Sequence, residues 1–392
     1  MTKKWSAWVL GVINLLSVVV LVFPFGWVML HNPQLLQSLL PTVFQQQEIQ
    51  QESSPVHGLL LSQQAASDAD TVLVQQLKKY TTLRQLKVEL KRFAGQQLQD
   101  GIFLTDDAMY ENIAVPNDSI TQSNINGMLE FVYRYYIPTY AVVVPTACAI
   151  KQDDIPSSAP LFNQKTYIDS IYRDISGVIT ACDVYSALFA AMDEYTYYRT
   201  HPELTGLGGY YLYTVLSDKM SFTPRTLAQF EQNYLEHNFY GTLYSRIPYA
   251  QVQPDIISYY RMALFSREYS MVRYETDGTI KKYDDLIVPE LLESGGDRMT
   301  DAILGGPAPM ITIKVDSPYR DKLLIFTDQT VKSYLPFLAA EYGEITIVDL
   351  SLIDEKQLKS LGVNRYNQIL FTYSLDTFSQ VDFGQQLLTL AN

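Results

Sequence analysis

The clearest pattern of apolar and polar positions in the chain lies between residues 321 and 349. Residues 323–326 form a short apolar run, which is typical of a strand buried on both faces of a parallel sheet. Apolar and aromatic residues then recur at helical spacing, at positions 331, 334, 335, 338 and 342. A second apolar run follows at 345–348. The pattern predicts a strand, a sharp turn, a helix that ends at Gly343, and a second strand.

Strands and helices are also expected to alternate along the rest of the chain. Apolar runs predict strands at 140–146, 177–183 and 368–373. Helical periodicity predicts helices at 76–99, 124–136, 167–175 and 184–192, with 205–237 mainly helical and a last helix at the C-terminus. This alternation predicts an α/β fold built on a doubly wound parallel sheet, whose ligand crevice lies at the carboxyl ends of the strands.

Residues 239–320 depart from this alternation. They are richer in polar alternation and in turn signals such as Asp277-Gly278 and Gly295-Gly296. We interpret them as an insertion with a few antiparallel strands, within a domain that spans residues 76–392.

The N-terminal part of the chain has the pattern of a membrane anchor. Two lysines precede residues 5–30, a stretch of 26 residues without a charge, and a helix of that length crosses a hydrocarbon layer of about 30 Å. The lysines predict a cytoplasmic N-terminus, and no cleavage site for a signal peptide follows. We therefore expect residues 1–30 to be a cytoplasmic tip and an uncleaved, single-pass anchor in the cell membrane. The Gln- and Ser-rich residues 31–75 form a linker to an extracytoplasmic domain.

Composition excludes several kinds of site. The formal net charge of −13 argues against a nucleic-acid partner, since phosphate binding needs a basic surface. Only His201 and His237 of the four histidines lie in the main body, so no His-rich metal site is expected, and no cofactor motif is present. Cys148 and Cys182 have neither metal-binding nor redox spacing. They are either two buried free thiols or, in an extracytoplasmic domain, a disulfide.

Several segments, taken together and in order, resemble the DHHW family over about residues 80–392. The matching segments are 100–104, 140–146, 194–200, 205–211, 238–245, Gly305-Gly306 and 328–338. The family comprises extracytoplasmic proteins that are SGNH-hydrolase-like and similar to those that O-acetylate alginate beside a membrane-bound O-acyltransferase. The resemblance implies an SGNH-like domain and a site for acyl transfer.

The family's naming motif, Asp-His-His-Trp, falls on residues 201–204, which here read His-Pro-Glu-Leu. The resemblance implies that the catalytic acid and base positions are His201 and Glu203, and that the nucleophilic serine position is Gln329. All three residues of the triad therefore differ from the family pattern. An amide cannot act as the nucleophile of a serine-ester mechanism, and loss of the nucleophile removes most of the rate enhancement.

Two main interpretations follow from this loss. In the first, the protein is a membrane-anchored pseudoenzyme that serves cell-surface polysaccharide O-acylation by binding a glycan or a partner such as the acyltransferase. The alternative is an active O-acetyltransferase or esterase, in which Glu203 orients His201 and His201 activates Thr330 or Ser333. A third interpretation is a purely structural surface protein with no remaining role in polysaccharide O-acylation.

Four more residues are candidates for the cleft. Asp328 is expected to cap the following helix through the backbone amides of residues 330 and 331. Tyr240, Gly241 and Thr242 match a family loop near the cleft, although a tight turn packed by aromatic side chains explains the same residues.

Overall fold

The computed structural model describes residues 81–391, except 157–158, 263–267 and 317–318. The predicted anchor at 1–30 and the linker at 31–75 lie outside these residues. Within the described residues, no helix is long and apolar enough to cross a membrane. The chain divides into two compact units. The described part of the smaller one comprises residues 81–100 and 246–251, and that of the larger comprises 101–245 and 252–391.

The described part of the smaller unit is built on helix α4 (Thr81–Phe93), which ends before the predicted end at residue 99. The helix stops because Gly95 adopts a positive φ of 86°. The Gly95 amide donates to the Arg92 carbonyl and the Gln96 amide to the Lys91 carbonyl, which is the Schellman pattern of a helix end. Leu98–Gln99 are then extended as β1, so the predicted helix was wrong at its C-terminal end.

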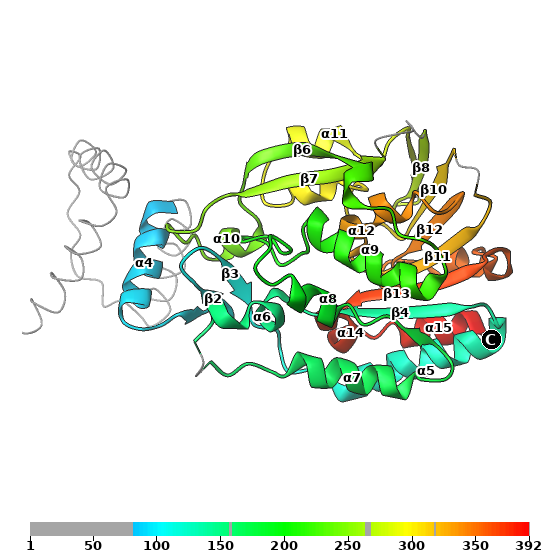
Figure 1. Cartoon of the computed structure of the whole chain (residues 1–392), viewed down its shortest axis with the longest axis horizontal. Coiled ribbons are helices and arrows are strands. Elements are labelled where there is room, and N and C mark those ends of the chain that lie inside the picture. The colour runs from blue at the N-terminus through cyan, green and yellow to red at the C-terminus, as the bar shows by residue number, and fades with distance from the viewer. Residues whose placement is uncertain (1–80, 157–158, 263–267, 317–318, 392) are drawn as a thin grey trace, which may run out of the picture. The chain divides into compact units, whose positions relative to one another are not determined.

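The larger unit contains an eight-stranded sheet with the order β5-β4-β13-β11-β12-β10-β8-β9 (Figure 1). Its strands are β4 (Thr139–Val144), β5 (Thr180–Ala181), β8 (Tyr269–Tyr274), β9 (Ile280–Tyr283), β10 (Met310–Val315), β11 (Lys322–Thr327), β12 (Glu344–Val348) and β13 (Gln368–Ser374). Neighbours from β5 to β12 in this order run parallel. The central strands are almost fully buried, which explains their continuous apolar runs.

The prediction of a parallel sheet is correct only in part, because the sheet is mixed. The few antiparallel strands predicted at 239–320 are confirmed, but they belong to the same sheet. Strand β10 runs antiparallel to β12, β8 antiparallel to β10, and β9 antiparallel to β8. Strands β8 and β9 are joined by a tight turn at Asp277-Gly278, which allows only an antiparallel pair. The segment interpreted as an insertion therefore contributes three strands to the main sheet.

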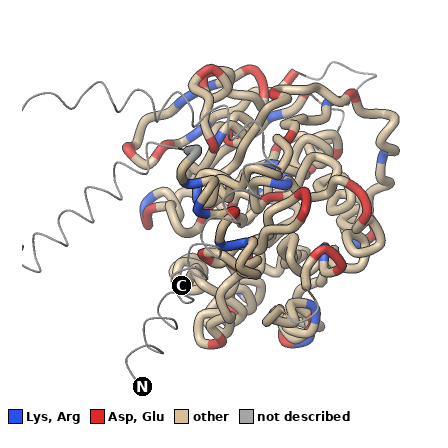
Figure 2. Tube along the Cα trace, turned by 90° about the vertical axis from the view of Figure 1, so that its left-hand side faces the viewer, with Lys and Arg blue, Asp and Glu red and all other residues tan. Residues whose placement is uncertain are grey.

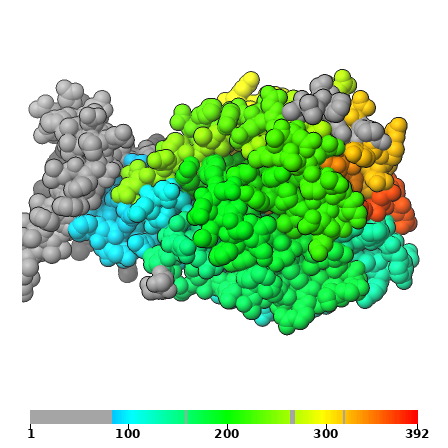
Figure 3. All heavy atoms as spheres, in the orientation of Figure 1, coloured from blue at the N-terminus to red at the C-terminus, as the bar shows by residue number. Residues whose placement is uncertain are grey.

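Helices cover both faces of this sheet. Their bounds are α5 (Asp118–Tyr135), α6 (Ala147–Ile150), α7 (Gln164–Asp174), α8 (Tyr185–Ala190), α9 (Gly206–Met220), α10 (Thr242–Arg246), α11 (Pro289–Glu293), α12 (Val331–Leu338), α13 (Glu355–Lys359), α14 (Leu375–Gln380) and α15 (Gly384–Ala391). Helix α5 packs against α15, and α9 packs against α12. In Figure 3, the segment from α7 to β6, coloured green, forms much of the visible face.

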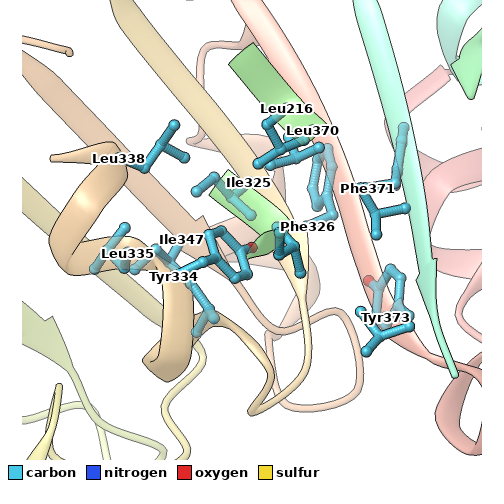
Figure 4. Close-up of a cluster of buried hydrophobic side chains, with 14 of the residues drawn as sticks. Leu216, Ile325, Phe326, Tyr334, Leu335, Leu338, Ile347, Leu370, Phe371 and Tyr373 are labelled. Carbon is cyan, nitrogen blue, oxygen red and sulfur yellow. The ribbon is translucent and has the colours of Figure 1, made fainter. Parts of the chain in front are cut away.

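The core shows why the two faces of the sheet carry different helices. Phe326 and Phe371 pair in register on β11 and β13, and Phe131 of α5 packs edge-on against both. The preceding residues, Ile325 and Leu370, point to the other face because side chains alternate along a strand. There they lie close to Leu216 of α9 (Figure 4).

The prediction that residues 205–237 are mainly helical was correct only as far as Met220. Ser221 adopts a left-handed conformation with φ 64°, and Pro224 follows, so the helix cannot continue. The chain then forms strand β6 (Phe230–Phe239), which pairs antiparallel with β7 (Asp255–Met262) in a separate two-stranded ribbon. A second, small hairpin joins β2 (Ile102–Leu104) to β3 (Met109–Glu111).

The strand–turn–helix–strand segment is confirmed, but the role of Gly343 is not. Helix α12 ends at Leu338, so Gly343 does not cap it. The Gly343 amide instead donates to the Asp321 carbonyl at 3.0 Å. A Cβ at this position would lie 2.5 Å from the Tyr319 carbonyl oxygen, so the close approach of two backbone segments requires glycine.

Acidic and basic positions are interspersed along the described chain (Figure 2).

Candidate functional site

A cavity of about 220 Å³ lies where the parallel strands end. Its walls include Val144 at the end of β4, Thr146 just after it, Gln329 and Thr330 after β11, and Ser374 at the end of β13. This is the carboxyl edge of the parallel part of the sheet, where α/β proteins bind their ligands (Figure 1). No lysine, arginine or histidine is among the described residues that line it.

Gln329 occupies the turn between β11 and α12 and lines the cavity. Its side chain forms no hydrogen bond with any described residue. The neighbouring Thr330 hydroxyl lies 3.5 Å from the Thr327 hydroxyl, and among the described residues no hydrogen bond joins it to a basic side chain. The turn therefore presents an amide, and not an activated hydroxyl, to the cavity.

Asp328 does part of what the sequence predicted. Its Oδ1 accepts the backbone N–H of Thr330 at 2.9 Å, but no hydrogen bond to the amide of residue 331 is found in the described chain. Its Oδ2 accepts the backbone N–H and the hydroxyl of Ser374, at 2.9 and 2.8 Å. Asp328 thus ties the turn after β11 to the end of β13, and it shapes the cavity floor more than it caps α12.

A second buried aspartate fixes the segment that carries residues 201–204. Asp255, which is fully buried, accepts the backbone N–H groups of Arg199 and Thr200 at 2.7 and 2.8 Å. It also accepts the hydroxyls of Thr200 and Tyr195. Four neutral donors therefore surround one carboxylate, and the backbone entering residue 201 is held in place from the β7 side.

His201 is buried, and its ring lies between aromatic side chains. The ring centroids of Phe239 and Tyr198 are 5.7 and 6.0 Å away. The backbone N–H of Thr242 donates to Nδ1 at 3.3 Å, so Nδ1 acts as an acceptor. The other nitrogen, Nε2, must then carry the proton, and it lies 3.3 Å from Oε2 of Glu203. The imidazole therefore donates to Glu203 through Nε2.

The predicted cleft loop packs behind the site. A Cβ on Gly241 would lie 2.5 Å from the Cβ of His201, so only glycine permits this contact. The Thr242 hydroxyl is 3.2 Å from Nδ1 of His201, and Tyr240 stacks on Tyr244 with centroids 4.3 Å apart. None of residues 240–242 is among the described residues that line the cavity, although Leu243 is.

The sequence analysis missed the residue that dominates the electrostatics of the site. Lys332 follows Gln329 by about one helical turn and is only 4% exposed. Its Nζ lies 2.8 Å from Oε1 of Glu203 and 2.8 Å from Oδ1 of Asp301. Arg298 pairs with the other oxygen of Asp301 at 2.8 Å. A lysine inside an otherwise apolar helix was the signal that a buried partner was required.

The charges of this network stabilise one another. Burial alone would raise the pKa of Glu203, but Lys332 and His201 outweigh it and lower that pKa to about 2. Burial alone would lower the pKa of Lys332, but Glu203 and Asp301 raise it above its ordinary value. Glu203 is therefore ionised, paired with a cation, and a poor base at neutral pH.

The loop that carries Asp301 is fixed by a buried arginine. The Arg273 guanidinium donates to the carbonyls of Leu304, Gly306 and Pro307. Gly305 has a φ of 84°, and a Cβ there would lie 2.8 Å from Nη1 of Arg273. The Gly-Gly pair is thus needed for the arginine to reach the loop, and the loop holds Asp301 against Lys332.

The structure brings His201 and Glu203 together, but it does not assemble the rearranged catalytic site. The hydrogen bonds of the His201 ring go to Thr242, Glu203 and the Thr300 hydroxyl. The Ser333 hydroxyl donates to the carbonyl of Thr330 at 2.9 Å. Within the described residues, no hydrogen bond joins His201 to the hydroxyl of Thr330 or Ser333.

The cysteines and metal ligands can be placed in the same way. Cys148 and Cys182 are both buried and free, and burial raises the pKa of each thiol to about 12. Of the two alternatives left open by the sequence, the structure therefore has buried thiols. No group of three or more His, Cys, Asp or Glu residues that could hold a metal ion occurs in the described parts of the chain.

Comparison with known proteins agrees with this architecture. A crystal structure of a DHHW family protein from Eubacterium siraeum DSM 15702 has 20% identity and a TM-score of 0.61, covering 73% of this chain and 96% of that one. The structure of Bacillus cereus PatB1 with a sulfonyl adduct has 18% identity and a TM-score of 0.60, covering 72% and 97%. At these identities the likeness shows the fold. No curated protein sequence matches the chain.

The sequence profile of the family described as "DHHW protein" matches residues 92–344. The match covers more than half of the chain and confirms the resemblance inferred from the sequence. This chain belongs to the DHHW family.

Proposed function

We propose that the protein is a non-catalytic DHHW family member that serves cell-surface polysaccharide O-acylation as an accessory, ligand-binding component. One observation carries this proposal. At the nucleophile position of the family, the cavity holds the amide of Gln329, while Glu203 at the base position is bound to Lys332.

The chemistry of acyl transfer explains why these residues do not support turnover. A serine-ester mechanism needs a hydroxyl and a base that takes its proton. The Gln329 amide is not nucleophilic, and the low pKa of Glu203 makes this carboxylate a weak proton acceptor. His201 has the right chemistry for a base, but its nitrogens are occupied by Thr242 and Glu203.

Binding, in contrast, is supported by the cavity. Its walls contain apolar side chains such as Val144, Leu204 and Leu243, and the Gln329 amide supplies one acceptor and two donors without a partner among the described residues. An apolar wall with a small number of converging polar groups is characteristic of a site that binds a small ligand. We infer that the cavity holds a sugar or acyl group of a polysaccharide without cleaving it.

The location and partner in this proposal rest on the sequence. The uncharged stretch at 5–30 would anchor the chain in the cell membrane, and residues 31–75 would link it to the extracytoplasmic domain. In that position the domain would lie beside a membrane-bound O-acyltransferase or the polysaccharide itself.

The test measures acyl chemistry directly, with the full chain in detergent. We expect hydrolysis of 4-nitrophenyl acetate at the rate of buffer alone, and no change in a His201→Ala, Thr330→Ala double variant. Because PatB1 was solved with a sulfonyl adduct, mass spectrometry after treatment with phenylmethylsulfonyl fluoride gives a second readout. We expect no adduct on residues 327–333.

Two outcomes would overturn the proposal. Turnover above buffer that disappears in the double variant would make His201 and Thr330 part of an active site. A sulfonyl adduct on Thr330 or Ser333 would show that one of these hydroxyls is activated. Circular dichroism of each variant checks that its fold is intact.

A further inference from the structure

A groove of about 570 Å³ lies at the opposite edge of the parallel strands. It is bordered by residues 220–225 after helix α9, and by residues at the start of β11 and β13. The cavity at the candidate site lies where the same strands end. Strand β11 has six residues, which at about 3.3 Å per residue separates the two edges by about 20 Å. One sugar unit cannot occupy both places, so the groove is a separate site.

The floor of the groove is a preorganised ion pair. Glu341 has a side chain that is 6% exposed, and it accepts Nε of Arg225 at 3.1 Å and the hydroxyl of Tyr213 at 2.9 Å. The Tyr213 hydroxyl in turn accepts the backbone N–H of Arg225 at 2.9 Å. The guanidinium plane is thereby fixed, while its two terminal amino groups have no hydrogen-bond partner in the described chain. They are available to a ligand at little entropic cost.

Other planar polar groups surround this pair. The Oε1 atom of Gln229 accepts the backbone N–H of Thr226 at 2.9 Å, which orients the amide and leaves its N–H groups for other partners. The exposed Asp321 adds carboxylate acceptors to the same groove. Donors and acceptors thus alternate around the groove. Vicinal hydroxyl groups, each a donor and an acceptor, match such an arrangement.

Two aromatic rings complete the groove. Phe222 stacks on Tyr213, with centroids 5.5 Å apart and an interplanar angle of 28°. Tyr319 lies on the rim with 43% of its surface exposed. Such rings offer flat apolar surface beside polar groups, and the C–H faces of a sugar ring require that combination.

The net charge of the groove restricts the charge of the ligand that it can bind. Arg225 and Glu341 neutralise each other, and Asp321 leaves the set with one net negative charge. An anionic ligand such as a uronate would be repelled, whereas an uncharged one would not.

We propose that this groove binds an uncharged sugar unit of a polysaccharide, away from the cavity that contains Gln329. The inference rests on the proposed function only in that it takes the ligand to be a polysaccharide. Two sites on opposite edges would hold one long chain more firmly than either site alone, because the second contact becomes intramolecular.

The experiment is isothermal titration calorimetry of the full chain in detergent with three neutral hexasaccharides: maltohexaose, cellohexaose and chitohexaose. A galacturonate hexamer is the anionic counterpart. We expect at least one neutral hexasaccharide to bind and the galacturonate not to bind. Arg225→Leu should weaken the neutral ligand at least tenfold, and Asp321→Lys should allow the galacturonate to bind. Arg261→Leu, which removes a half-exposed arginine paired with Asp285, is the matched control and should change nothing.

A second variant is needed because Arg225→Leu could lose binding through misfolding. Arg225→Leu leaves the buried Glu341 without its cation, so Tyr319→Ala, which removes a ring on the rim that is 43% exposed, must also weaken binding. Absence of binding by all three neutral hexasaccharides would overturn the inference, as would loss of binding in Gln329→Leu instead of Arg225→Leu. Either result would leave the ester-hydrolysis test of the proposed function unaffected.

Discussion

Two carboxylates are next to His201, the buried Asp255 and the partly buried Glu203, and they are held in opposite ways. Asp255 is surrounded by neutral donors: two backbone N–H groups and the hydroxyls of Thr200 and Tyr195. Glu203 is held by the Lys332 ammonium and the imidazole of His201. Both carboxylates are satisfied, but only the second depends on a charge from a distant part of the chain.

The two carboxylates therefore have different roles: Asp255 supports the backbone of the site, and Glu203 belongs to its chemistry. Asp255 positions a backbone segment, and an arrangement of that kind serves an active and an inactive site equally well. The Lys332 network determines what residue 203 can do, because it keeps the carboxylate ionised and occupied. We infer that the scaffold of the family site has been kept, while the reactive groups have been converted into a buried ion cluster.

The largest expected effect comes from removing the cation of this cluster. Lys332→Met leaves Glu203 with only His201, and Asp301 with only the exposed Arg298, as charged or hydrogen-bonded partners. Breaking a buried pair from one side costs about 3–5 kcal/mol of the free energy of unfolding. Urea denaturation at pH 7 measures it. Adding Glu203→Gln to Lys332→Met should recover part of the loss, since the uncompensated charge is removed.

Its matched control is Lys359→Met, which removes an exposed lysine paired with Glu355. That change should leave the free energy of unfolding within about 0.5 kcal/mol of the wild type. Equal effects of the two lysine variants would show that the buried cluster does not contribute to stability, and the contrast with Asp255 would fail.

The second effect is on the pH dependence of stability. The pKa of Glu203 is lowered from its ordinary value of 4.5 to about 2 in the folded protein. A lowered carboxyl pKa contributes stability that is fully present above pH 4.5 and is lost as pH falls through about 2. The shift corresponds to about 3 kcal/mol. We expect the wild type to lose this amount relative to Glu203→Gln between pH 5 and pH 2 in urea denaturation.

Parallel curves for the two proteins across this pH range would contradict the prediction. They would mean that Glu203 titrates alike in the folded and unfolded states, as an unpaired carboxylate would.

The smallest expected effect is at the neutral clamp. Asp255→Asn keeps the shape of the side chain but weakens several hydrogen bonds and places an amide donor against other donors. We expect a loss of about 2 kcal/mol in the free energy of unfolding. Asp284→Asn, at an exposed position, is the control and should have little effect. A loss larger than that of Lys332→Met would reverse the order of importance of the two regions.

The sequence predicted the central part of the fold well because its signals are local. The apolar run at 323–326 and the helical spacing from Val331 identify β11 and α12 without reference to any other segment. Antiparallel strands were predicted in the segment 239–320, but their place in the main sheet was missed because pairing partners are not local. Residues 310–315 lie next to β12 in space only through a register that the amphipathic pattern does not encode.

The sequence likewise predicted the residues of the candidate site but not which distant residues would pair there. The resemblance to the family predicted the triad positions, and the structure places Glu203 and Gln329 on one cavity. The ion cluster could not be predicted, because Lys332 and Asp301 are separated by thirty-one residues and meet only after the loop that carries Asp301 folds. An isolated charge within an apolar helix indicates that a partner exists, but it does not say which residue that partner is.

The buried position of Lys332 also constrains how this lineage can change. Gln329→Ser alone would supply a hydroxyl with no base, and Glu203→His alone would place an imidazole against the ammonium of Lys332. Replacing Lys332 first would remove the cation between Glu203 and Asp301 and leave only the exposed Arg298 paired with Asp301. Each single step toward an active triad is therefore useless or harmful by itself. Under the proposed non-catalytic function, epistasis among these residues would therefore oppose a return to catalysis by single substitutions.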